Sequence, residues 1–246
     1  MQDAIALFAI RLICGMGFML CVMPRKDVAA AFFRIMLLVA LGFAVLFALT
    51  LPSEMWPGVT LAGLAFLGSV FWLLERRRTG AGVIVIVFAV SLLELLRLGA
   101  RENTAASPGG IWLAHASALA SAGTLGAALT GMLLGHRYLT APGMPLAPLC
   151  RLNQALGVAT LFRLAVSAAA FFVGMAALTD STYWIWLALR WLAGILGPLA
   201  ACVMVHRILR YRNTQAATGV LFVAVILTFI GELTADLLQR AVHVPF

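Results

Sequence analysis

The feature that most constrains this chain is a series of long apolar runs separated by short polar segments. Eight runs follow one another along the 246 residues, each close to the length of about 18–20 residues that crosses the hydrocarbon core. They are continuous rather than alternating, which favours transmembrane helices over a barrel. We therefore predict an all-α polytopic membrane protein with eight transmembrane helices. The expected spans are residues 4–23, 29–51, 58–74, 81–99, 112–135, 153–178, 182–206 and 216–238.

Composition excludes an ordinary soluble domain. Hydrophobic residues make up 63% of the chain and charged residues 11%, whereas soluble domains carry about 25% charged residues. The mean hydropathy is +1.05.

The formal charge of +8 would suggest nucleic acid as a partner for a soluble protein. Here the basic residues lie in the loops after the first, third, fifth and seventh spans, so we interpret them as a topology signal and expect no nucleic-acid partner. These residues are Arg25, Lys26, Arg76, Arg77, Arg78, Arg137, Arg151, Arg207, Arg210 and Arg212. The positive-inside rule then predicts a bacterial-type inner-membrane protein with both termini on the outer, periplasmic side.

Two segments, residues 31–50 and 160–179, align without gaps and suggest a duplication. The matched pairs are Phe33/Phe162, Arg34/Arg163, Ala40/Ala169, Phe43/Phe172 and a closing Ala-Leu-Thr. The predicted fourth and eighth helices also each carry a glutamate near the outer end, Glu94 and Glu232. We infer two four-helix bundles related by a parallel repeat. The first unit covers about 1–103 within a segment 1–138 that reaches the end of the fifth helix, and the second unit covers 104–246.

Ionisable residues gather in the outer half of the predicted membrane region. Arg11 and Arg190 are expected about 10–12 Å below the outer surface, and Arg163 near the middle. The others are Glu94, Arg97, His115, Glu232 and Asp236. Two interpretations stay open, because such groups either pair across helices as a structural lock or line a polar pocket.

Glu232 and Asp236 are the most informative pair. They lie four residues apart, hence on one helix face, and repel each other unless an arginine or a proton intervenes. We therefore predict that these two acids, with His115, exchange protons, and that Arg11, Glu94, Arg163 and Arg190 form a quinone or anion pocket.

His136 and His206 end the fifth and seventh predicted helices at similar depth, so haem b is a second, less favoured cofactor hypothesis. We identify no metal-site motif, phosphate-binding glycine loop or nucleophile elbow.

The helical layout of the whole chain resembles that of the polysulfide-reductase/NrfD-type membrane subunits, although no motif carries the likeness. The resemblance implies the membrane subunit of a multi-subunit electron-transfer complex, which anchors redox partners and binds quinone. At most, the chain is then the membrane subunit of an oxidoreductase, embedded among lipids. The alternatives are a transporter of a small anionic or lipid-like solute and a purely structural subunit.

Overall fold

The chain forms a bundle of membrane-length helices. The computed structural model describes residues 2–52, 55–102, 108–141, 143–175, 178, 180–242 and 244–245. Its helices are α1 (Gln2–Val22), α2 (Ala30–Thr50), α3 (Met55–Leu73), α4 (Arg77–Glu102), α5 (Pro108–Thr140), α6 (Ala147–Gly174), α7 (Ser181–Trp191), the π-helix η3 (Leu192–Leu196), α8 (Gly197–Arg210) and α9 (Thr214–Val242). Because α7, η3 and α8 are continuous, the described residues contain eight helical spans that are long and apolar enough to cross a membrane. The predicted fold class is confirmed.

The ends of the spans differ from the predicted ones. The largest change is in α6, which begins at Ala147 rather than near residue 153 and ends at Gly174 rather than near residue 178. Pro148 lies in its first turn, where a missing backbone N–H leaves no helical hydrogen bond unmade. The whole of α6 is thereby shifted towards the preceding loop, which changes the depth of every residue in it.

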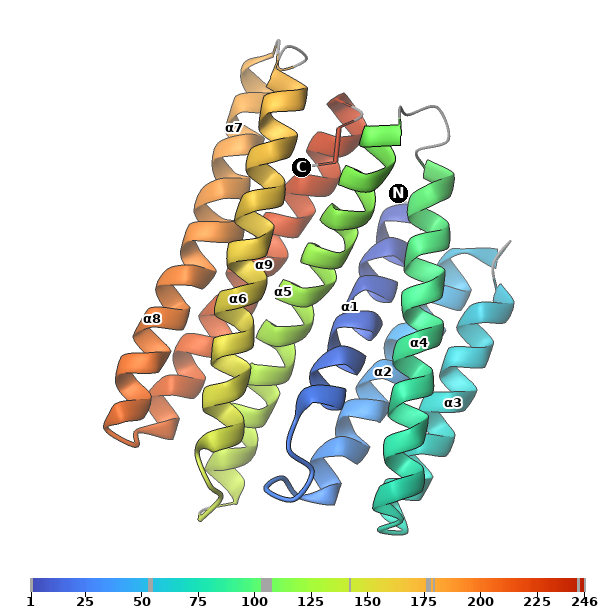
Figure 1. The fold of residues 1–246 in the computed structure, drawn as a ribbon, viewed down its shortest axis with the longest axis vertical. Helices are drawn as coiled ribbons and strands as arrows, with labels where there is room; N and C mark the ends of the chain where they lie inside the picture. Colours follow the sequence, from blue (N-terminus) through green and yellow to red (C-terminus); the bar gives the residue numbers. More distant parts are fainter. Residues whose placement is uncertain are drawn as a thin grey trace.

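The spans are arranged as two four-helix groups (Figure 1). In the first group α1 packs on α2, α2 on α3, α3 on α4, and α4 on α1. In the second group α5 packs on α6, α6 on α8, α8 on α9, and α9 on α5. The helix order around the two bundles is therefore the same, as a parallel repeat predicts.

The first helix of each bundle forms the centre of the molecule. About 72% of the α1 span and 78% of the α5 span are buried, against 33–44% of each of the other six. The outward surfaces of those six carry large apolar side chains such as Phe66, Ile185 and Phe172, which is 80% exposed. Such a surface is stable in hydrocarbon and not in water.

The two bundles meet where α1 crosses α5 at a pair of glycines. A Cβ atom added to Gly15 would lie 1.8 Å from the carbonyl oxygen of Ala122, and one added to Gly126 would lie 2.1 Å from the carbonyl carbon of Gly15. No other residue type fits this distance. The crossing is an example of the small-residue contact by which membrane helices approach closely.

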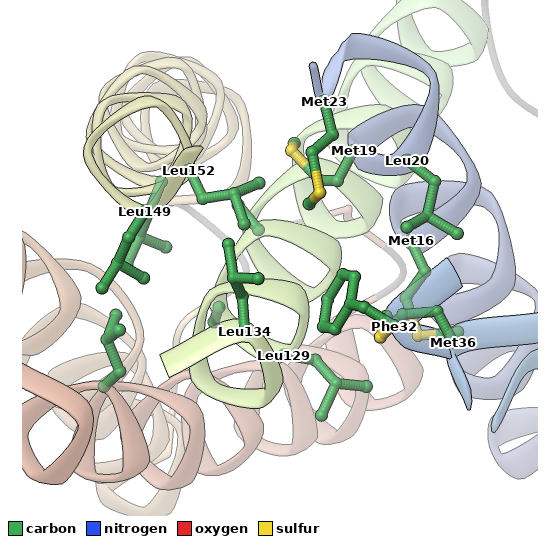
Figure 2. Packing of buried hydrophobic residues seen from close by; sticks show 14 of the residues in the cluster. Met16, Met19, Leu20, Met23, Phe32, Met36, Leu129, Leu134, Leu149 and Leu152 are labelled. Atoms are coloured by element: carbon green, nitrogen blue, oxygen red, sulfur yellow. The ribbon is translucent and has the colours of Figure 1, made fainter. Parts of the chain in front are cut away.

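An apolar core continues across this crossing. Figure 2 shows Met16 and Met19 of α1, and Met23 directly after it, with Leu129 and Leu134 of α5. Further members of the same cluster come from α2, α6, α8 and α9. The two bundles therefore share one core at this level and are not separate bodies.

The two ends of the molecule differ in charge. Both ends of the described chain lie at the same end of the bundle, here called the terminal end (Figure 1). The opposite end, here called the basic end, holds 11 Lys and Arg residues and, of the acidic residues that the structure describes, Asp27 and Glu75.

The gapless alignment that suggested the repeat does not match structurally equivalent residues. Phe33 is buried while its aligned Phe162 is 48% exposed, and Arg34 is exposed while its aligned Arg163 is buried. Residues that face opposite environments are not counterparts in two bundles of the same design. The helix arrangement repeats, whereas that particular residue correspondence is wrong.

The glycine crossing gives a first prediction. Gly126→Ala should lower the free energy of unfolding by about 1–3 kcal/mol, because its methyl group overlaps the α1 backbone. Gly63→Ala is the matched control, since a Cβ atom there meets nothing within 4 Å. The measurement is thermal unfolding in detergent, and equal stability of the two variants would show that the helices do not cross this closely.

Candidate functional site

The candidate site is centred on the carboxylate of Glu232, which is fully buried in α9. Arg163 of α6 donates from Nε to Oε1 at 3.2 Å and from Nη2 to Oε2 at 3.1 Å. Arg190 of α7 donates from Nη1 to Oε1 at 3.1 Å. The hydroxyl of Ser121 in α5 donates to Oε2. One carboxylate thus accepts four hydrogen bonds from three other helices.

Arg163 is held by α5 as well as by α9. Its Nη1 donates to the carbonyl oxygen of Ser117 at 3.0 Å and to the hydroxyl of the same residue at 2.6 Å. The buried face of α6 also carries the polar residues Asn153, Thr160 and Ser167. In contrast with a water-soluble helix, the polar side of α6 therefore faces the bundle interior, as expected where the surroundings are lipid.

Arg190 reaches Glu232 from a helix that changes its geometry at that point. Asp180 caps the start of α7 by accepting from the backbone N–H of Thr182 at 2.9 Å, and this bond holds the pKa of the aspartate below its ordinary value. Trp191, the residue after Arg190, ends α7, and the π-helix begins at Leu192. The backbone N–H of Gly197 bonds to the carbonyl oxygen of Leu192. Single π-turns inside longer helices occur frequently at functional sites.

A second glycine pair explains how the π-helix and α9 come close enough. A Cβ atom added to Gly194 would lie 2.8 Å from the Cα atom of Gly231 and 2.6 Å from Nη1 of Arg190. The Arg190 guanidinium therefore lies beside the glycine contact. Since Gly231 directly precedes Glu232, the close approach delivers the guanidinium to the carboxylate.

A second ion pair joins the two bundles. Arg11 of α1 donates to Oδ1 of Asp236 in α9 at 2.8 Å, with side-chain exposures of 7% and 13%. The charge of Arg11 also interacts electrostatically with Arg163, Arg190 and Glu232. We call these five residues the charged cluster.

Members of the charged cluster lie at nearly one depth. Arg11, Arg163, Arg190 and Glu232 are each nine to eleven residues from the terminal end of their helix, or about 14–17 Å. The sequence placed Arg163 deeper than Arg11 and Arg190. That difference disappears because α6 ends at Gly174, which brings all three arginines to the level of Glu232.

The predicted repulsion between Glu232 and Asp236 is relieved by arginines. Arg163 and Arg190 neutralise Glu232, and Arg11 neutralises Asp236. The cluster contains three arginines and two carboxylates, so it carries one excess positive charge. Glu232 accepts hydrogen bonds from four donor atoms and is fully buried, whereas the Asp236 side chain is 13% exposed.

The remaining predicted residues near the terminal end form a separate group on α4 and α5. Glu94 pairs with Arg97 of the same helix at 2.9 Å, the predicted i,i+3 contact. His115 is half-buried beside Gly99, where an added Cβ atom would lie 3.4 Å from its Nδ1. Among the described residues this buried Nδ1 has no hydrogen-bond partner. The structure therefore brings His115 to α4 and does not include it in the charged cluster.

The two histidines proposed as haem ligands are exposed. His136 lies on the surface of α5, and His206 lies on the surface of α8 with Nε2 3.4 Å from Nη2 of Arg210. This arrangement gives the haem hypothesis no support.

Three serines that bond to the charged cluster, Ser117, Ser121 and Ser167, were not predicted from the sequence. All three serines are buried and bond to a charged residue of the cluster. Ser117 and Ser121 lie four residues apart on α5 and therefore on one face of that helix. The repeated hydroxyl groups inside an apolar helix could have indicated a buried polar face. They do not reveal which ion they contact.

Comparison with protein-family models, with curated proteins and with solved structures finds no significant match to the chain. Within the parts of the chain that the structure describes, no three His, Cys, Asp or Glu side chains are grouped so as to hold a metal ion.

Removing the negative charge of Glu232 should lower the free energy of unfolding. Glu232→Gln leaves two buried arginines without their counter-charge, and we expect a loss of about 3–5 kcal/mol in unfolding free energy. Glu75→Gln is the control, because Glu75 is exposed at the basic end. A loss below about 1 kcal/mol for Glu232→Gln would contradict the buried cluster.

Proposed function

We propose that this multi-pass membrane protein is the membrane subunit of a multi-subunit redox complex, which anchors its partners and binds quinone or quinol in the terminal half of the second bundle. The observation that supports this proposal is a row of ionisable side chains on one face of α9. Exposed Arg240, partly buried Asp236 and buried Glu232 follow one another at four-residue intervals, about 6 Å apart. Such rows of ionisable groups inside membranes mark proton and substrate paths.

The chemistry of quinone reduction needs what this row offers. A quinone takes up two electrons and two protons to become a quinol, so its site must contain hydrogen-bond donors for the quinone oxygens and a group that exchanges protons with water. Arg11 and Arg190 are the donors in this proposal. Asp236 exchanges the protons in this proposal, because it is the cluster carboxylate whose side chain is partly exposed.

The other residues of the proposal have supporting roles. Arg163 and Glu232 form the fixed interior of the site, since each is saturated by buried partners. His115, with its unpartnered Nδ1, and the pair Glu94 and Arg97 lie towards the entrance. Electrons come from redox subunits outside this chain, so the chain is at most one component of an oxidoreductase.

The orientation of the protein is part of the same proposal. Eleven of the 17 basic residues lie at the basic end, which the positive-inside rule assigns to the cytoplasm. The terminal end then faces the periplasm of a bacterial-type inner membrane, and the proton path opens on that side.

The test is purification of the complex from its native membrane with extraction of bound quinone. We expect co-purified redox subunits and about one quinone per chain. Asp236→Asn should lower quinol turnover on the order of 10²-fold, the contribution typical of one acid–base group. Asp27→Asn, at the basic end, should leave turnover unchanged.

A protein that purifies alone, without quinone or redox partners, would contradict the redox proposal. Full turnover in the Asp236→Asn complex would contradict only the assigned proton route.

A second candidate function is transport of a small anion. The excess positive charge of the cluster, three arginines against two carboxylates, favours it. The same purification separates the two, because a transporter is expected as a lone oligomer whose melting temperature rises with an added anion. A purely structural subunit would show neither quinone nor anion dependence.

A further inference from the structure

A groove lies between the two bundles at the basic end, far from the charged cluster. One wall is the end of α1 and the turn after it, with Met19 and Met23. The other wall is the start of α6, with Pro148, Leu152 and Ala155. Figure 2 shows Met19 and Met23 on one side and Leu152 on the other, with Leu134 of α5 between them. The space between the two walls amounts to about 230 Å³, a volume that includes the open side of this shallow groove.

Both walls are fixed in place. The turn after α1 is closed by a bond from the N–H of Asp27 to the carbonyl of Pro24 at 3.2 Å, and Arg77 of α4 donates to the carbonyl of Arg25 at 3.1 Å. On the other side, the hydroxyl of Tyr138 donates to the carbonyl of Pro145, just before α6. These hydrogen bonds hold the chain segments that flank the groove on both sides.

The groove combines an apolar interior with a positive mouth. Nearly all of its lining is aliphatic or methionine, which suits a hydrocarbon chain and not a polar solute. Arg151 is the charged residue among its lining side chains, and it is exposed. Arg25 and Lys26 directly follow Pro24, another lining residue.

Arg151 lies at the depth in the membrane that is expected for a lipid headgroup. It lies four residues into α6, about 6 Å from the helix start, whereas Ala155 lies about 6 Å deeper. A phosphate held at Arg151 would therefore be at the membrane surface while its acyl chain follows the groove inwards. Basic pockets between membrane helices are known sites for anionic lipid headgroups.

We propose that this groove is a specific binding site for one anionic phospholipid, with an acyl chain between α1 and α6 and the phosphate on Arg151. An ordinary boundary lipid contacts the convex surface of one helix. The proposed lipid instead contacts both bundles, and its negative charge selects it over neutral lipids. It strengthens the contact between the bundles at the end opposite to the Arg11–Asp236 ion pair.

The experiment is lipid titration of the purified protein in detergent, read by melting temperature and by native mass spectrometry. Phosphatidylglycerol should raise the melting temperature and remain bound, whereas phosphatidylcholine should do so several-fold less. Arg151→Gln should weaken phosphatidylglycerol binding about fivefold, as expected for one basic contact. Ala155→Phe, which fills the groove, should abolish retention of the lipid.

Arg34→Gln is the matched control, since Arg34 is an exposed arginine near the basic end and outside the groove. It should bind phosphatidylglycerol like the unchanged protein. Arg151→Gln acts on binding of the headgroup, and Ala155→Phe acts on binding of the acyl chain. If one of these variants does not fold, the other still tests the proposal.

Three results would overturn the proposal. Equal binding of the two lipids would show ordinary boundary lipid. An equal shift with glycerol phosphate would show a site for a soluble anion. A change of oligomeric state in Ala155→Phe would show that a second copy of the chain covers the groove.

Discussion

A carboxylate removed from water and from lipid headgroups must be paired inside the protein, and Glu232 imposes this requirement on the whole second bundle. The cost of an isolated ion in such a place is several kcal/mol or more. Its four hydrogen bonds come from α5, α6 and α7, so the position of each of these helices is tied to α9. The glycine contact and the π-helix serve the same requirement, because they bring Arg190 within reach.

The two bundles share a helix order but have different interiors. At the terminal end of the first bundle the core is apolar, with Ile10 of α1, Phe47 of α2 and Leu95 of α4 among its members. In the second bundle the corresponding space between helices contains arginines, serines and a glutamate. Arg11 extends from the first bundle to the charged cluster. The two bundles thus combine one helix order with an apolar interior in the first and a charged cluster in the second.

Much of this fold could be predicted from sequence because hydrocarbon acts on whole segments. Eight apolar runs of membrane length specify eight helices, and the gathering of charges in one half of the membrane was visible from helix counting. The exact depth of Arg163 could not be predicted, since it depends on the end of α6 at Gly174. Nor could the partners of Glu232, because pairing depends on helix rotation and on two glycines that are far apart in sequence. The apparent match of Arg34 with Arg163 failed for the same reason: shared letters do not specify which side of a helix faces the core.

The most direct test of the central claim is the coupling energy between Arg163 and Glu232. The free energies of unfolding of Arg163→Met, Glu232→Met and the double variant are compared with that of the unchanged protein in the same detergent. A buried, two-point ion pair predicts that the double variant is more stable than the sum of the single losses implies, by about 2–3 kcal/mol. Additive losses, within about 0.5 kcal/mol, would show that the two side chains do not meet and would contradict the account of the second bundle.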